Sequence, residues 1–184
     1  MLIQAQEQAQ AQTKAQAQAQ TQSQPQQSFP YPALPDTLRS VEQRAGYLSE
    51  HYWDNYNFAD TLMLKSEEVT EQGFVNFIDI LGRFNPAIAQ KGIAGFTRKA
   101  FTNAVAKERF ESLIEHYFEN PQSPLRNDRV YLLFLEEMKN SPCFDEAEKE
   151  RLAFKIKTTN KNLPGDIAIN FNFKDENGKS HQLS

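Results

Sequence analysis

The 184-residue sequence contains one cysteine, Cys143, so the chain alone forms no internal disulfide and carries no CxxC pair for dithiol chemistry. It has no basic excess either: 20 Lys and Arg stand against 24 Asp and Glu, which argues against nucleic acid as a partner. No apolar run approaches the roughly 20 residues of a membrane helix, so we expect no transmembrane segment. The sequence also lacks a P-loop, a GxSxG motif and an HExxH motif, which removes three common enzyme signatures.

The first part of the chain has few side chains that are able to form a core. Gln and Ala dominate residues 1–28, and their burial does not offset the entropy of ordering a chain. We therefore predict a low-complexity tail that is disordered or loosely helical. The motif FPYPALP at 29–35 contains three prolines, which favour an extended path. It predicts a linker whose apolar side chains pack on the domain that follows.

Residues 36–162 have the periodicity of amphipathic helices. Six helices are expected, and their predicted N-caps or first inward residues are Asp36, Ser66, Asn85, Phe110, Asn127 and Asp145. The connections between them are short, which favours antiparallel neighbours. The predicted fold is mainly α, an antiparallel bundle of about six helices.

The last segment, 163–184, changes to the period of a strand. Apolar residues alternate with polar ones from Ile167 to Phe173, the turn sequence DENG follows at 175–178, and residues 179–183 alternate again. This pattern predicts a β-hairpin at the C-terminal end of the chain. An isolated hairpin is marginal in water, so its apolar face needs a partner, either the helices or further strands.

The most conspicuous cluster of chemically active side chains lies between the first two predicted helices. His51 and Asp54 are spaced as a base and its orienter, or as two metal ligands, but neither a nucleophile nor a third ligand is nearby. The alternative is an aromatic helix end, with Trp53 anchored in the core and tyrosine hydroxyls reaching polar partners. We predict no catalytic residue, no metal ligand and no cofactor. The candidate binding residues are His51, Tyr52, Trp53, Asp54 and Tyr56.

Two further residues have reactive side chains. His116, between Glu115 and Glu119 on a predicted helix, is more typical of a solvated histidine than of a ligand. Cys143 precedes a predicted helix start, a position that lowers the pKa of a thiol and makes it reactive. The alternative is that Cys143 is a small, unreactive core residue. A hydrolase or metalloenzyme built on His51 and His116 is therefore the weakest functional class.

Several motifs resemble a helical N-terminal domain of unknown function that occurs in bacterial exported thioredoxin-like proteins, the thiol-disulfide oxidoreductase and peroxiredoxin-related group. The motifs are HYWD at 51–54, FADT at 58–61, TEQGFVNFID at 70–79 and NPQSP at 120–124. The resemblance covers roughly residues 34–163. It implies that the hairpin forms the first two strands of a thioredoxin-like domain whose remainder, with the redox CxxC, would follow Ser184. No residue of this sequence matches that CxxC.

The resemblance implies a non-catalytic helical domain of an exported thiol-disulfide oxidoreductase. Its partner would be a protein client or its own thioredoxin-like domain, and its location the periplasm or cell envelope. The residues LIQA at 2–5 are compatible with the end of a secretory signal. The alternative is a stand-alone binding or structural helical module of the cell envelope that uses an aromatic groove at 47–58.

Overall fold

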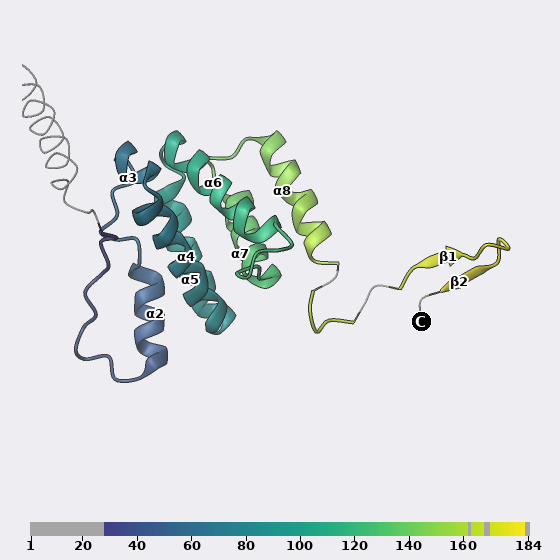
Figure 1. Ribbon diagram of the computed structural model, residues 1–184, viewed down its shortest axis with the longest axis horizontal. Coiled ribbons are helices and arrows are strands. Elements are labelled where there is room, and N and C mark those ends of the chain that lie inside the picture. The colour runs from purple at the N-terminus through teal and green to yellow at the C-terminus, as the bar shows by residue number, and fades with distance from the viewer. Residues whose placement is uncertain (1–27, 162, 168–169, 183–184) are drawn as a thin grey trace, which may run out of the picture.

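The computed structural model describes residues 28–161, 163–167 and 170–182, and the predicted tail therefore lies almost entirely outside it. The described helical segments are α2 (Val41–His51), α3 (Thr61–Lys65), the π-helical turn η1 (Glu67–Glu71), α4 (Gln72–Arg83), α5 (Pro86–Ala100), α6 (Ala104–Glu119), α7 (Asp128–Asn140) and α8 (Glu146–Thr159). The helices lie side by side, from α2 at one end of the body to α8 at the other (Figure 1). The predicted mainly α fold is confirmed.

Helix starts follow the predicted caps closely. The Asn85 side chain accepts from the amides of Ala87 (2.8 Å) and Ile88 (3.2 Å), with Pro86 at the first helical position of α5. Asp145 and Glu148 form a complete capping box, in which each side chain accepts from the other residue's amide at 2.8 Å. The predicted cap Asn127 also accepts from backbone amides at the start of α7. Ser66 accepts from the Val69 amide, but it caps η1, and α4 begins at Gln72 without a side-chain cap. Local chemistry therefore sets most helix starts in this chain.

The first helix begins later than predicted. Ser40, not Asp36, is the N-cap: its hydroxyl accepts from the Gln43 amide and the Gln43 side chain accepts from the Ser40 amide, both at 3.1 Å. This reciprocal pair satisfies two free amides at once, which explains why the helix starts there. The helix α3, capped by Asp60, was not predicted. Its five residues are too few to display a helical period.

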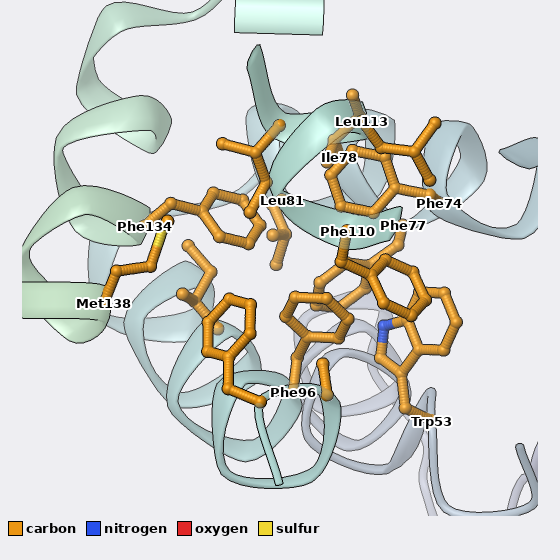
Figure 2. Packing of buried hydrophobic residues seen from close by; sticks show 14 of the residues in the cluster. Trp53, Phe74, Phe77, Ile78, Leu81, Phe96, Phe110, Leu113, Phe134 and Met138 are labelled. Atoms are coloured by element: carbon orange, nitrogen blue, oxygen red, sulfur yellow. The ribbon is translucent and has the colours of Figure 1, made fainter. Parts of the chain in front are cut away.

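Aromatic side chains from α4, α5, α6 and α7 meet in one core (Figure 2). Phe74 and Phe77 of α4, Phe96 of α5, Phe110 of α6 and Phe134 of α7 are all buried. The Phe96 ring lies 5.0 Å from the Phe110 ring and 5.9 Å from the Phe134 ring, in edge-to-face contacts. This shared cluster makes the four helices one packing unit.

The predicted hairpin is present. Its strands β1 (Asn172–Lys174) and β2 (Ser180–Gln182) pair antiparallel, with Phe173 opposite His181. Gly178 has a φ of +79°, which glycine adopts without a side-chain penalty, and the Asp175 carboxylate accepts from the Lys179 amide at 2.9 Å. The first strand begins at Asn172 instead of Ile167. The expectations for Ile169 and Leu183 lie outside the described residues.

Beyond Leu163, the apolar side chains that the structure describes in the hairpin segment are not packed on the helices. Ile167, Phe171 and Phe173 are 96%, 55% and 44% exposed, and the two strands stand away from the helical body (Figure 1). Arg129 of α7 holds the start of the connection, since its guanidinium donates to the Pro164 carbonyl (3.3 Å) and the Asp166 carboxylate (2.7 Å). Among the described residues, the apolar side chains of the hairpin are therefore uncovered, and the helices do not cover them.

Candidate functional site

The predicted binding residues lie at the end of α2 and in the turn that follows it. The amide of Asp54 donates to the His51 carbonyl at 3.0 Å, and the amide of Tyr56 donates to the Trp53 carbonyl at 3.3 Å. These tight turns divide the side chains of 51–56 between the core and the surface. Tyr52, Trp53 and Tyr56 point inward, whereas His51 and Asp54 stay at the surface.

The aromatic part of this cluster belongs to the core. Tyr52, Trp53 and Tyr56 are 0%, 2% and 5% exposed. The Trp53 ring lies 5.2 Å from the Phe96 ring and 5.3 Å from the Phe110 ring, among the side chains that join the helices (Figure 2). Its indole nitrogen has no hydrogen-bond acceptor among the described residues. These three side chains therefore offer no open aromatic groove to a ligand.

The tyrosine hydroxyls of the cluster bond to buried partners. Tyr52 donates from its hydroxyl to the Gly73 carbonyl of α4 at 3.0 Å, and the Tyr56 hydroxyl bonds to the Thr70 hydroxyl. Burial raises the pKa of both phenols, so both stay protonated. They tie the turn after α2 to η1 and the start of α4.

The polar part of the cluster is a surface network around Asp54. Its carboxylate lies 2.7 Å from His51 Nδ1 and also pairs with the ammonium of Lys99 on α5. Burial raises the pKa of the Asp54 carboxyl, but the hydrogen bonds from Lys99 and His51 outweigh burial and hold the pKa below its usual value. The Tyr47 ring packs against the His51 ring at 4.2 Å. The network links α2 to α5 and presents a partly exposed imidazole.

This geometry predicts a small, pH-dependent effect of Asp54→Asn. A carboxyl whose pKa is lowered by folding stabilises the protein above its unfolded pKa, about 3.9, and loses this contribution as the pH falls through that range. The variant should lose at most about 1 kcal/mol of unfolding free energy at pH 7, because solvent screens a pair exposed to this degree. Urea unfolding should show that the difference in unfolding free energy between the variant and the unaltered chain disappears near pH 3. A gap of constant size from pH 7 to pH 3 would contradict the assignment.

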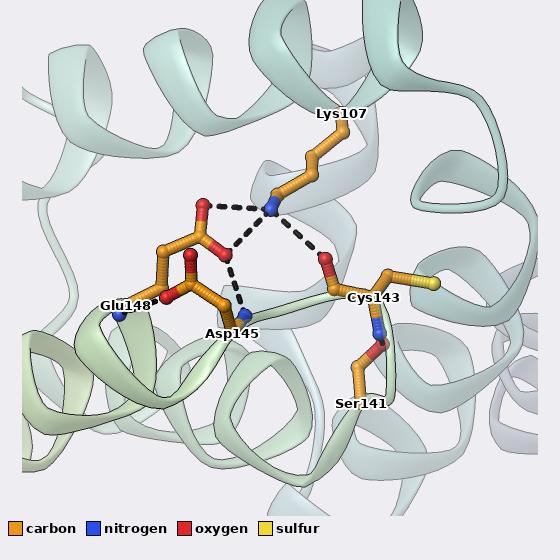
Figure 3. Close-up of polar contacts among 5 residues, drawn as sticks. All are labelled: Lys107, Ser141, Cys143, Asp145 and Glu148. Atoms are coloured by element: carbon orange, nitrogen blue, oxygen red, sulfur yellow. Dashed lines mark hydrogen bonds and ion pairs between the residues drawn. The ribbon is translucent and has the colours of Figure 1, made fainter.

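The remaining reactive residues, His116 and Cys143, lie on other parts of the chain than His51: His116 on α6 and Cys143 between α7 and α8. Among the described residues, no group of three or more His, Cys, Asp or Glu is placed to hold a metal ion. His116 lies on α6, exposed, with its ring 4.8 Å from the Tyr117 ring. Cys143 is exposed, and Lys107 binds its backbone carbonyl at 3.0 Å, not its thiol, which points away from the Lys107–Glu148 ion pair (Figure 3).

The structure adds one residue that the predicted site did not include. Phe29, from the proline-rich segment, is 7% exposed, and its ring lies 4.8 Å from the Tyr52 ring and 5.1 Å from the Trp53 ring. It rests on Gly73 of α4, where a β-carbon would lie 2.3 Å from its ring. The sequence signal was a glycine inside an apolar helical stripe. We call Tyr52, Trp53, Tyr56 and Gly73 the aromatic socket.

These features define a class of protein: a helical module that is followed by a two-stranded antiparallel hairpin and contains one cysteine. Residues 3–162 match the family described as "Domain of unknown function (DUF5106)", and the chain belongs to this family. No curated protein is significantly similar to the chain. Among the described helices, none has the length and apolar character needed to cross a membrane.

The chain is also similar to a solved structure, a thioredoxin-like protein from Bacteroides caccae ATCC 43185. The two share 36% sequence identity with a TM-score of 0.74, over 85% of this chain and 57% of that protein. The chain thus spans little more than half of its solved relative. The predicted resemblance to the helical domain of thioredoxin-like proteins is confirmed.

Proposed function

We propose that this chain is the non-catalytic helical part of an exported thiol-disulfide oxidoreductase, in which the helices bind or position a protein client or the thioredoxin-like domain. The observation that carries the proposal is the 36% identity to a thioredoxin-like protein of which this chain spans 57%. One cysteine excludes a CxxC within the 184 residues. The proposal therefore assigns the redox pair to sequence outside them.

The hairpin supports this assignment. Phe171 and Phe173 are about half exposed, and a two-stranded sheet of this size is marginal in water by itself. Additional strands on the same sheet, with helices over its apolar face, would cover such residues. A thioredoxin-like domain supplies both. Export is part of the proposal because protein disulfides persist in oxidising compartments.

The reading frame beyond the codon for Ser184 provides the first test. We expect it to continue into a thioredoxin-like segment with a CxxC, and a stop codon there would favour the alternative, a stand-alone binding or structural module of the cell envelope. The second test compares insulin reduction by the continued protein and by residues 1–184 alone. We expect turnover only for the former. Fractionation of cells that express the natural gene tests export, and recovery with the cytoplasmic fraction would contradict it.

Cys143→Ser is expected to leave the insulin-reduction rate of the continued protein unchanged. A dithiol cycle needs two thiols that pair with each other, and the Cys143 thiol is exposed, free and without a second cysteine in this sequence. The matched control replaces one cysteine of the expected CxxC and should abolish turnover. A rate that falls severalfold in Cys143→Ser would assign this thiol a redox role that the proposal denies it.

A further inference from the structure

We propose that the aromatic socket is a recognition site for an aromatic side chain that precedes a proline in a non-helical segment of a partner protein. In this chain, Phe29 of the motif FPYP occupies the socket and so covers the site. The proposal concerns binding alone and does not depend on the thioredoxin assignment.

The socket has the shape of a receptor for one ring. The Phe29 ring packs edge-on against Trp53 at 5.1 Å, with an interplanar angle of 86°, and lies nearly parallel to Tyr56 at 6.0 Å. Its floor is the bare backbone of Gly73, because a β-carbon at this position would meet Phe29 Cδ2 at 2.3 Å. The Tyr52 hydroxyl binds the Gly73 carbonyl and braces this floor. The site therefore admits an aromatic ring only because α4 has no side chain at this position.

Phe29 reaches the socket from a segment that belongs to no helix or strand in the described part of the chain. Asn55 donates to the Tyr31 backbone carbonyl at 3.2 Å, and Asn76 of α4 donates to the Tyr31 hydroxyl at 2.9 Å. The Tyr31 amide also donates to the Phe29 carbonyl at 3.0 Å, which makes a tight turn at Pro30. Side chains of the body thus hold this turn by one backbone group and one side-chain tip. Domains that bind proline-rich peptides also use an aromatic pocket.

The segment is able to leave without breaking a helix. The bonds between Tyr31 and the two asparagines use amide side chains, not the backbone groups of α2 or α4. A groove of about 730 Å³ opens between the segment and the helical body, lined by Ser28, Phe29 and Tyr31 of the segment together with Glu71, Val75 and Tyr117. This groove leaves room for residues that flank an incoming aromatic ring. Local opening of Phe29 would then expose a complete site, while the helices stay folded.

The chain has a built-in reporter for this exchange, since Trp53 is its one tryptophan and lines the socket. Phe29→Ala should shift the Trp53 emission to the red and leave the helical circular dichroism unchanged. Titration with the peptide SFPYPALP, the sequence of residues 28–35, should return the emission to the blue with saturation. Affinity for the unaltered chain should be at least about 100-fold weaker, because the tethered segment competes at high effective concentration.

Two controls identify the site. The first control is the peptide SAPYPALP, which lacks the aromatic ring and should not bind Phe29→Ala. The second is the double variant Phe29→Ala/Gly73→Val, which should not bind SFPYPALP because the valine side chain fills the space of the Phe29 ring. Pro30→Gly/Pro32→Gly keeps Phe29 but loosens its segment, so it should bind SFPYPALP severalfold more tightly than the unaltered chain does.

Three results would overturn the proposal. The first is loss of helical signal in Phe29→Ala together with no gain in binding for Pro30→Gly/Pro32→Gly, which would make Phe29 an ordinary core residue. The second is binding of SFPYPALP with equal affinity to the unaltered chain and to Phe29→Ala. The third is a dimer of the unaltered chain that forms by exchange of residues 28–35, which would make a second copy the occupant. None of these results bears on the reading frame beyond Ser184, so this proposal and the redox proposal fail separately.

Discussion

Trp53→Ala is expected to cost about 3–5 kcal/mol of unfolding free energy, a large part of the stability of a domain of this size. The indole is 2% exposed and contacts rings from three helices: Phe77 of α4, Phe96 of α5 and Phe110 of α6. Alanine would leave a cavity at their junction and would remove the ring against which Phe29 packs. Urea unfolding followed by circular dichroism measures the loss, since the variant has no tryptophan for fluorescence.

Phe154→Ala provides the matched control for this prediction. Phe154 is also a large aromatic residue, but it is 70% exposed on the outer side of α8. Its removal should change the unfolding free energy by less than about 0.5 kcal/mol. A Trp53→Ala protein that unfolds within about 1 kcal/mol of the unaltered chain would show that the core closes around the missing indole.

The helix starts and the hairpin turn could be predicted because short-range chemistry sets them. Asn85 followed by Pro86, the Asp145–Glu148 pair and the turn ending at Gly178 each need only four or fewer consecutive residues. The start of the first helix was mispredicted because two nearby residues carry a local capping signal. Asp36 and Ser40 are both good caps in isolation, and Ser40 has Gln43 to complete its box.

The candidate site was harder to predict because its residues divide between the core and the surface. Periodicity cannot assign the inner and outer sides of 51–56, since the helix ends within this stretch and successive turns reorient each side chain. The partner of Asp54 is Lys99, 45 positions away, and the sequence gives no local sign of it. The core position of Trp53 was one of two interpretations that the sequence left open.

The burial of Phe29 agrees with the prediction that apolar side chains of 29–35 pack on the domain, whereas Tyr31 and Leu34 are 51% and 41% exposed. The place where Phe29 packs could not be predicted from a local pattern. Its segment has no periodicity, and its seat is Gly73, far along the chain. Glycine in a helix interior usually costs stability relative to alanine, so a glycine in an apolar stripe indicates close packing at that point. The pattern does not say which group packs against the glycine. The tertiary fold decides this, both at Gly73 and at Gly92.

Gly92 of α5 lies where α5 packs directly on α2. A β-carbon at Gly92 would lie 2.9 Å from the Ser49 backbone carbonyl and 3.1 Å from its β-carbon. Because the first of these atoms is backbone, α2 as a whole would have to move. Gly92→Ala should therefore cost about 1–3 kcal/mol despite the better helix propensity of alanine.

Gly46, on α2 itself, supplies the matched comparison, because a β-carbon there would meet nothing within 4 Å. Gly46→Ala should stabilise the chain by about 0.5–1 kcal/mol, through helix propensity alone. Urea unfolding of both variants, with buffer and probe held the same, should thus give changes of opposite sign for one chemical substitution in two packed helices. If both variants gain stability, α2 and α5 are separated by more than the structure shows. If both variants lose stability, a group must contact α2 at Gly46, where the described residues leave space for a β-carbon.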